Sequence, residues 1–167
     1  MIETLKIRRI QPQDRPSLKA LLHAQSHFRP EEIRVALELI DLALAQPGEE
    51  DYVILCAEER EGEIRGYICY GKAPLTEAVY DIYWIVVHPA YWSQGTGSSL
   101  LRQAEGELAQ RQARLLLIET SSTPPYRIPR AFYGKHGYRE QARVRDYYRP
   151  DDHKIIYSKN LKGRNET

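Results

Sequence analysis

Apolar and polar residues follow patterns along this chain that predict a mixed order of strands and helices. Residues 5–8 alternate with period two, which is typical of an edge strand with one solvated face. Residues 33–44 place apolar side chains at helical spacing after Pro30, and Pro47-Gly48 ends that pattern. The predicted strands are residues 5–8, 52–57, 64–71, 79–87, 114–120, 138–148 and 154–159. The predicted helices begin after Asp14 and at Pro30, and cover residues 97–111 and 130–136.

The order of these elements predicts an α/β fold of the α+β type. Residues 79–87, 97–111 and 114–120 form a strand–helix–strand unit, whose two strands are expected to pair in parallel through a right-handed crossover. Short turns join the other strands, so we expect a mixed, mostly antiparallel twisted sheet with flanking helices around this central parallel unit. A doubly wound nucleotide-binding fold alternates strands and helices throughout, unlike this chain. We expect one domain over residues 1–160 and a frayed tail over 161–167.

Composition narrows the classes of function. The formal net charge of the 167 residues is +1, which argues against a nucleic-acid binder that acts by neutralising phosphates. No apolar run approaches the ~18 residues that span a bilayer, so no membrane partner is expected. The N-terminus lacks a signal-peptide core, and Cys56 and Cys69 lie in apolar runs, so we predict buried thiols and a cytoplasmic protein. The cysteines lack the spacing of a zinc site, and His23 and His27, four residues apart, lack a carboxylate or Cys that would complete a ligand set, so no metal is predicted.

A glycine-rich turn follows the strand at 79–87. Residues 92–97 read Trp-Ser-Gln-Gly-Thr-Gly and open a helix, whose first N–H groups have no intrahelical partners. Glycines let a backbone approach phosphate oxygens closely, and the positive end of the helix dipole favours an anion there. Residues 131–138 add a second motif, in which the aromatic pair Phe132-Tyr133 lies in a short helix ended by Gly137.

With these two motifs in this order, the chain resembles the GNAT superfamily of acetyl-CoA-dependent N-acetyltransferases over nearly its whole length. Both glycines of the family's turn match, but Trp92 stands where the family has Gln or Arg. The resemblance implies acetyl-CoA as co-substrate, a pyrophosphate held by the turn, and a pantetheine arm paired with the fourth strand where it diverges from the fifth. Tyr126 stands where many relatives have Asn. The implied cofactor-binding residues are Ile85, Val86, Val87, Trp92, Ser93, Gln94, Gly95, Thr96, Gly97, Ser98 and Tyr126.

Acyl transfer to an amine needs a base for the ammonium, a donor for the thioester carbonyl and a proton for the thiolate. The expected carbonyl donor is the backbone N–H of Val86 or Val87. Asp81 is a candidate base, because a carboxylate in an otherwise apolar strand is costly unless it is paired or functional; a structural carboxylate is the alternative. Glu119 is a second candidate base, or the partner of an arginine. Tyr133 matches the family's general acid, or it packs on the cofactor without donating a proton.

The amine acceptor is the least defined part of the prediction. The resemblance places it against the first two helices, the fourth strand and the last hairpin, with Tyr83 and Glu119 as lining. Such a wall suits a cationic amine, whereas arginines at 139, 143, 145 and 149 favour an amine that also bears a carboxylate. We expect N-acetyl transfer to a primary amine of a small molecule or peptide, with a homodimer left open; a non-catalytic acyl-CoA-binding module with a regulatory role is the alternative. Further lining candidates are His27, Phe28, Asp146, Tyr147 and Tyr148.

Overall fold

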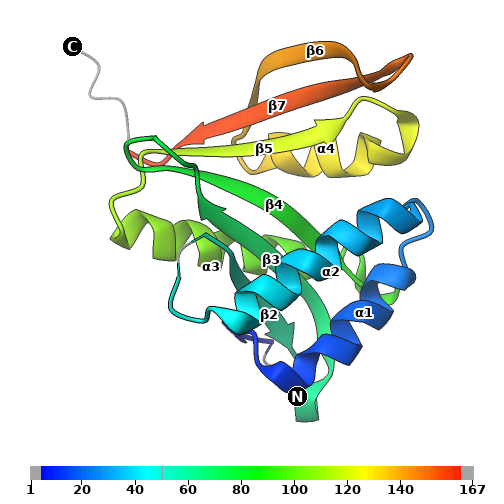
Figure 1. Ribbon diagram of the computed structural model, residues 1–167, viewed down its shortest axis with the longest axis vertical. Helices are drawn as coiled ribbons and strands as arrows, with labels where there is room; N and C mark the ends of the chain where they lie inside the picture. Colours follow the sequence, from blue (N-terminus) through cyan, green and yellow to red (C-terminus); the bar gives the residue numbers. More distant parts are fainter. Residues whose placement is uncertain (1–4, 50, 163–167) are drawn as a thin grey trace. The chain divides into compact units, whose positions relative to one another are not determined.

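The computed structural model describes residues 5–49 and 51–162 (Figure 1). The strands in this part of the chain are β1 Lys6–Arg9, β2 Val53–Glu58, β3 Ile64–Lys72, β4 Val79–Val87, β5 Leu115–Ser121, β6 Arg139–Arg149 and β7 Asp152–Asn160. The α-helices are α1 Arg15–His23, α2 Pro30–Ala45, α3 Thr96–Gln110 and α4 Arg127–Lys135, and short 3-10 helices include η3 Pro89–Tyr91 and η4 Pro124–Tyr126. The predicted order of strands and helices is confirmed. Residues 163–167 of the predicted frayed tail lie outside the described residues.

The chain forms two compact units, and β4 contributes to both. The first unit comprises Met1–Lys72 and Tyr83–Glu107, and the second comprises Ala73–Ile82 and Leu108–Thr167. The hydrogen-bonded strand order is β1-β2-β3-β4-β5-β7-β6, in which β4 and β5 are parallel neighbours. The predicted α/β fold, a mixed sheet with one central parallel unit and flanking helices, is therefore confirmed.

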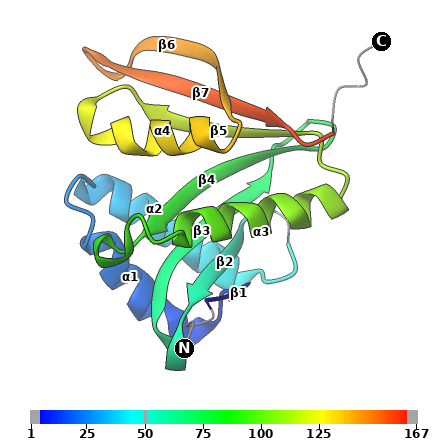
Figure 2. The same ribbon diagram turned by 180° about the vertical axis from the view of Figure 1, so that it is seen from behind.

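In the first unit, β1, β2 and β3 pair in antiparallel fashion, with Cys56 of β2 opposite Tyr67 of β3. The helices α1 and α2 lie on one face of these strands and α3 lies on the other (Figures 1 and 2). Leu18 and Leu22 of α1 and Ile40 of α2 are fully buried in the core on the first face. These side chains form the apolar stripes that hold the two helices on the sheet.

The N-cap residue of α1 belongs to a network of charged side chains. Asp14 is the N-cap residue, but its carboxylate makes no capping bond to the helix. It accepts hydrogen bonds from the Arg8 guanidinium at 2.7 and 2.9 Å and from the Gln11 amide at 2.8 Å. Arg8 also donates to both carboxylate oxygens of Glu58 at 2.9 Å. Burial alone would raise the pKa of Asp14, but the bonds from Arg8 and Gln11 and the charge of Arg8 hold it below its usual value.

In the second unit, Val79–Ile82 of β4 pair in parallel with Leu115–Ile118 of β5. Beyond the last of these pairs, β4 continues to Val87 and β5 to Ser121. The other pairings are antiparallel, β5 with β7 and β7 with β6. Within this unit α4 lies against one face of the strands (Figure 2).

The helix α4 begins at Arg127, three residues before the predicted start. Pro129 does not prevent this, because the first turn of a helix leaves its N–H groups unbonded. The helix ends in a Schellman motif: Tyr138 donates its N–H to the Tyr133 carbonyl, and Gly137, at φ 83°, donates to the Gly134 carbonyl, both at 3.1 Å. The predicted terminating role of Gly137 is confirmed. None of the described helices is long and apolar enough to cross a membrane.

Candidate functional site

The predicted site residues fall into two groups, one in each unit. Tyr83, the end of β4 and the glycine-rich turn belong to the first unit. Asp81, Glu119, Tyr126 and Tyr133 belong to the second.

The turn that follows β4 is an exposed loop shaped by left-handed backbone conformations. After η3, Ser93 has a φ of 60° and Gly95 a φ of 84°, whereas Thr96 begins α3. The Ser99 N–H donates to the Gly95 carbonyl at 2.9 Å. The amides just before Ser99 therefore belong to the helix terminus, where N–H groups lack intrahelical acceptors. A concave row of N–H groups at a helix N-terminus is a ready site for a phosphate.

Trp92, which departs from the family's turn, fastens this loop to the strand. Its indole N–H donates to the Val87 carbonyl at 2.8 Å, while 46% of the residue stays exposed. Gln25, a residue that the sequence did not single out, donates its side-chain amide to the same carbonyl at 3.1 Å. Gln25 is 95% buried, as its relative exposure of 5% shows. No local pattern in the sequence joins residues 25, 87 and 92, which explains why the contact could not be predicted.

Asp81 lies in a charged cluster on one face of the second unit's sheet. Asp81 is opposite Leu117 of β5, so Glu119, two residues further along, shares its face. Glu119 is in turn opposite Ile156 of β7, which places Lys154 on the same face. The Lys154 ammonium is 2.5 Å from a Glu119 carboxylate oxygen and 4.4 Å from the centre of the Tyr147 ring. Glu119 therefore has a lysine partner, not the arginine named as its alternative.

The two carboxylates of this cluster differ in their surroundings. Burial is the main reason why the pKa of Asp81 is raised above its usual value, the nearby charge of Glu119 raises it further, and Lys154 opposes both. Burial would lower the pKa of Lys154, but its hydrogen bond and charge interaction with Glu119 raise it overall, so this lysine stays charged at neutral pH. Lys154 was missed from the sequence because its place depends on the register of β7 against β5.

Tyr133 lies on the opposite face of the same sheet. Its ring, on α4, is 5.9 Å from the ring of Tyr157, and Tyr157 is opposite Ile118 of β5. Ile118 neighbours Glu119 in the chain and so points to the other face. Burial and the nearby Tyr157 raise the pKa of Tyr133 to about 12. The hydroxyl of Tyr133 is therefore protonated throughout the physiological range.

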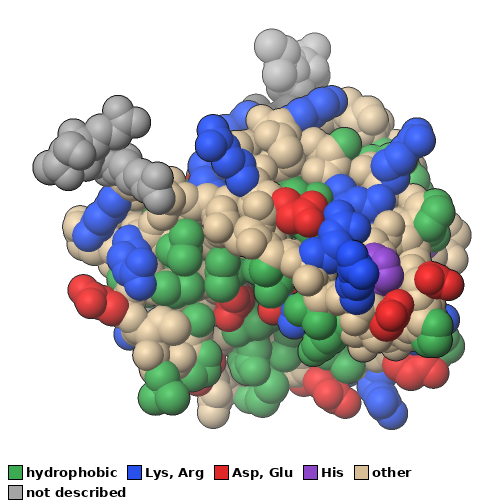
Figure 3. Space-filling view, turned by 90° about the horizontal axis from the view of Figure 1, so that it is seen from above, with side chains coloured by type: hydrophobic (Ala, Val, Ile, Leu, Met, Phe, Trp, Pro, Cys, Tyr) green, Lys and Arg blue, Asp and Glu red, His purple; other side chains and the backbone are tan. Residues whose placement is uncertain are grey.

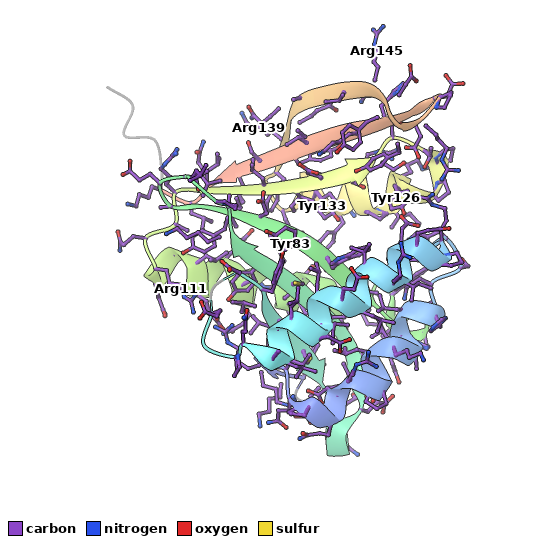
Figure 4. All side chains as sticks on the ribbon, in the orientation of Figure 1. Tyr83, Arg111, Tyr126, Tyr133, Arg139 and Arg145 are labelled. Atoms are coloured by element: carbon purple, nitrogen blue, oxygen red, sulfur yellow. The ribbon has the colours of Figure 1, made fainter. Side chains whose placement is uncertain are left out.

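Tyr126 ends η4, at the point where the chain enters α4 (Figure 4). Its N–H donates to the Thr123 carbonyl at 3.1 Å. Arg130 holds the same loop by donating to the carbonyls of Ser121 at 2.7 Å and Thr123 at 3.0 Å. The Ser121 hydroxyl bonds the carboxylate of the buried Asp152 at 2.5 Å. These contacts fix the segment between β5 and α4 that carries Tyr126.

The candidates for acceptor lining also divide between the units. In the first, the ring of Phe28 is 4.7 Å from that of His27 and 5.4 Å from that of Trp84, and burial lowers the pKa of His27. Tyr83 on β4 (Figure 4) contacts Tyr52, with ring centres 5.6 Å apart. In the second, the rings of Tyr147 and Tyr148 meet edge to face at 5.0 Å. Asp146 accepts a bond from the Asp151 amide and lies 3.6 Å from the His153 ring nitrogen.

The arginines of β6 lie on a mixed, exposed surface. Every residue of β6 is exposed, and basic and acidic side chains share the face seen in Figure 3. Arg143 bonds Glu140 at 3.0 Å, and Arg149 is 4.0 Å from Asp152. Arg145 extends outward from the strand (Figure 4).

His88 and the two cysteines lie in surroundings that are typical of structural residues. The His88 ring nitrogen accepts the Ala90 amide N–H at 3.2 Å. Cys56 and Cys69 are buried, as predicted, and burial raises the pKa of each thiol to about 12. Within residues 5–49 and 51–162, no group of three or more His, Cys, Asp and Glu side chains is arranged to hold a metal ion.

These features can be set against known proteins. A family model described as an acetyltransferase (GNAT) domain matches residues 50–140, more than half of the chain. The chain belongs to the GNAT acetyltransferase family. Membership supports an acyltransferase activity, and it accounts for the parallel β4–β5 unit with a glycine turn between β4 and α3. Comparison with curated proteins gives no match.

Solved structures show the same fold over nearly the full length of the chain. An acetyltransferase of the GNAT family from Desulfovibrio desulfuricans is 35% identical, with a TM-score of 0.90 and coverage of 95% of this chain and 99% of that one. The ribosomal-protein-S18-alanine N-acetyltransferase from Escherichia coli is 20% identical, with a TM-score of 0.75 and coverage of 98% and 99%. The PaiA N-acetyltransferase from Thermoplasma acidophilum, in complex with coenzyme A, is 16% identical, with a TM-score of 0.74 and coverage of 94% and 99%.

Proposed function

We propose that this GNAT protein is an acetyl-CoA-dependent N-acetyltransferase that acts on a primary amine of a small molecule or peptide. The observation that carries the proposal is the placement of Asp81 and Tyr133 on opposite faces of one sheet. Direct transfer needs a proton acceptor for the amine and a hydrogen-bond donor for the departing sulfur, and these two side chains supply them from the two faces of the sheet. A domain that only holds acyl-CoA needs no such pair.

In the proposed reaction the amine nitrogen attacks the thioester carbonyl carbon, and the carbon–sulfur bond breaks. Asp81, through a water molecule, accepts the proton that the ammonium gives up. A backbone N–H at the end of β4 donates to the carbonyl oxygen as negative charge develops on it. Tyr133 donates a hydrogen bond to the departing sulfur, and the second proton that the nitrogen loses reaches the thiolate through solvent. The products are the N-acetylated amine and the free thiol of coenzyme A.

Asp81, not Glu119, is the proposed base. Glu119 is bound by the Lys154 ammonium at 2.5 Å, so its carboxylate already has a charged partner. The pKa of Asp81 is raised, chiefly by burial. A carboxylate with a raised pKa holds a proton better near neutral pH, as a general base must.

The loop at residues 93–98 is the proposed site for the pyrophosphate. Its support is the backbone geometry at Ser93 and Gly95, the start of α3 at Thr96, and the presence of coenzyme A in the complex of the Thermoplasma acidophilum relative. Acetyl-CoA at about 100 times its Kd would then add roughly 2.7 kcal/mol to the free energy of unfolding. ATP, which lacks the pantetheine arm, serves as the comparison ligand.

Two measurements test the proposal in sequence. Thermal unfolding with acetyl-CoA or ATP first establishes the cofactor, and thiol release against a panel of amines then establishes turnover. We expect stabilisation by acetyl-CoA alone and thiol release with at least one primary amine. Tight binding of acetyl-CoA with no thiol release from any amine would instead favour the non-catalytic binding module.

A further inference from the structure

One backbone carbonyl at the end of β4 receives two side-chain donors. The Val87 carbonyl accepts the Trp92 indole N–H at 2.8 Å and the Gln25 side-chain amide at 3.1 Å. Gln25 also donates to the Leu21 carbonyl, at the end of α1, at 3.2 Å. A carbonyl oxygen has two lone pairs, so both of its acceptor positions are occupied. We call Gln25, Val87 and Trp92 the carbonyl clamp.

The orientation of Val87 follows from its neighbour. The His88 N–H donates to the Arg65 carbonyl of β3 at 2.8 Å, so His88 directs its backbone groups toward β3. Backbone groups of successive residues in an antiparallel strand point to opposite sides, so the N–H and carbonyl of Val87 point away from β3. The absence of a side chain at Gly66 allows β3 and β4 to approach closely. A Cβ at this position would lie 2.7 Å from the Val86 carbonyl oxygen and 3.2 Å from the Val87 Cα.

The sequence left the backbone N–H of Val86 and that of Val87 as alternative donors to the thioester carbonyl, and the orientation of the strand distinguishes them. Val86 directs its backbone groups toward β3, by the same alternation. Val87 directs its N–H away, and its carbonyl is already taken by the clamp. The amide of Val87 is therefore the one at this strand end that is oriented to meet a ligand.

We propose that Gln25 and Trp92 are positioning residues, which hold the backbone at Val87 through its carbonyl so that the Val87 N–H, in the preceding peptide group, meets the thioester carbonyl. The proposal rests on the proposed function. Gln25 anchors the carbonyl to the end of α1, and Trp92 anchors it to the phosphate-binding loop. The clamp therefore links the strand end that polarises the thioester to the loop that holds the pyrophosphate. Trp92 can make this contact although the family has Gln or Arg at the position, because its indole supplies one N–H donor, which bonds the Val87 carbonyl.

Two conservative substitutions remove the donors separately. Trp92→Phe keeps an aromatic ring without the indole N–H, and Gln25→Met keeps a side chain of similar length without the amide. Gln103→Met is the matched control, because Gln103 donates to Glu107 on the exposed face of α3 and not to β4. The double variant Gln25→Met with Trp92→Phe leaves the Val87 carbonyl without either donor.

The sequence offers a specific probe of this carbonyl. Val87-His88 is the only Val-His pair in the chain, so carbonyl-¹³C valine with ¹⁵N histidine gives one correlated NMR signal, from Val87 and His88. We expect the Val87 carbonyl carbon to shift upfield in each single variant and further in the double variant. The Gln103→Met protein should give the wild-type position.

The effect on the thioester is measured with and without turnover. In bound acetyl-CoA labelled at the acetyl carbonyl, the ¹³C signal should lie downfield of free acetyl-CoA and move back toward it in the clamp variants. The kcat should fall roughly threefold to tenfold in each single variant, the range expected for one hydrogen bond. In the double variant the fold loss of kcat should exceed the product of the two single-variant losses. The Kd of coenzyme A, which lacks the acetyl group, should change less than kcat.

The outcomes separate the clamp from the proposed function. An unchanged Val87 signal in Trp92→Phe and Gln25→Met overturns the clamp, and so does an unchanged acetyl carbonyl signal. Equal losses of kcat in Gln103→Met would show a general structural effect and would also overturn it. If the wild type turns over no amine, the proposed function fails, and the acetyl carbonyl signal still decides whether the clamp orients the thioester.

Discussion

Replacement of Tyr133 by Phe tests the acid half of the proposed mechanism. Tyr133 has a pKa of about 12, and a thiol such as that of coenzyme A has a pKa near ~8.5, the value for cysteine. The difference of about 3.5 units makes complete proton transfer from Tyr133 to a solvated thiolate unfavourable by roughly 5 kcal/mol, at ~1.4 kcal/mol for each unit. Tyr133 therefore acts in the transition state chiefly as a hydrogen-bond donor to the developing thiolate.

The size of the expected loss follows from that role. A hydrogen bond to a charged group contributes about 1.5 to 3 kcal/mol, so Tyr133→Phe should lower kcat by roughly 10-fold to 150-fold. The ring of Tyr133 contacts the rings of Phe132, Tyr138 and Tyr157. Phe preserves these contacts, so the midpoint of thermal unfolding should stay near that of the wild type. Tyr157→Phe is the control, because it removes a hydroxyl from the ring that packs against Tyr133.

The assay is thiol release from acetyl-CoA, followed from about pH 7 to about pH 10 with one acceptor amine. Because a group with a pKa of about 12 stays protonated over this range, the loss of kcat in Tyr133→Phe should be the same at each pH. A decline in wild-type kcat above pH 9 that disappears in Tyr133→Phe would mean that the hydroxyl ionises much earlier. A kcat within about twofold of the wild type at every pH would refute the donor role itself.

Three further changes have defined outcomes. Asp81→Asn should lower kcat/KM by about 10²-fold to 10⁴-fold with an alkylamine and much less with a weakly basic amine, because only the first needs a base; equal losses with both would point to a structural carboxylate. Gly95→Ala places a side chain at φ 84° and should raise the Kd of coenzyme A, measured by calorimetry. The free energy of unfolding should fall by only about 1–2 kcal/mol. Arg8→Met leaves the carboxylates of Asp14 and Glu58 unpaired and should lower that free energy by roughly 3 kcal/mol in urea at pH 7. The folded-state pKa of Asp14 is lowered, so the ion pair of Asp14 with Arg8 stabilises the fold at pH values above the usual carboxyl pKa. This stabilisation is lost as the pH falls through the lowered pKa of Asp14. A difference in the free energy of unfolding between the wild type and Arg8→Met that stays constant down to acid pH would contradict this account.

The sequence predicted those parts of the fold and site that depend on local patterns. The bounds of β4 at Val79–Val87 agree with its apolar run, and the glycine turn precedes α3 as expected. Gly137 terminates α4 in a left-handed conformation, which a short motif can specify. The start of α4 was placed too late, because Pro129 was not recognised as a first-turn residue.

Contacts between distant segments could not be predicted in the same way. Lys154 meets Glu119 only because β7 pairs with β5 in one particular register. The convergence of Gln25 and Trp92 on Val87 depends on the path of the chain after α1 and on a turn 60 residues later. Periodicity gives the faces of each element but not the partner that each face meets. Both missed features are polar side chains whose partners lie in another element.

The register of β7 against β5 therefore also decides the chemistry of the site. Tyr157 is opposite Ile118 on β5, so it shares the face on which Tyr133 packs, while Glu119 turns to the face of Asp81. A slip of one residue would exchange these faces, because side chains alternate along a strand. Burial opposes such a slip, since Leu116 and Ile118 are buried and Glu119 is exposed. The same hydrophobic alternation that stabilises the sheet thus keeps the proposed base and the proposed acid on opposite sides of it.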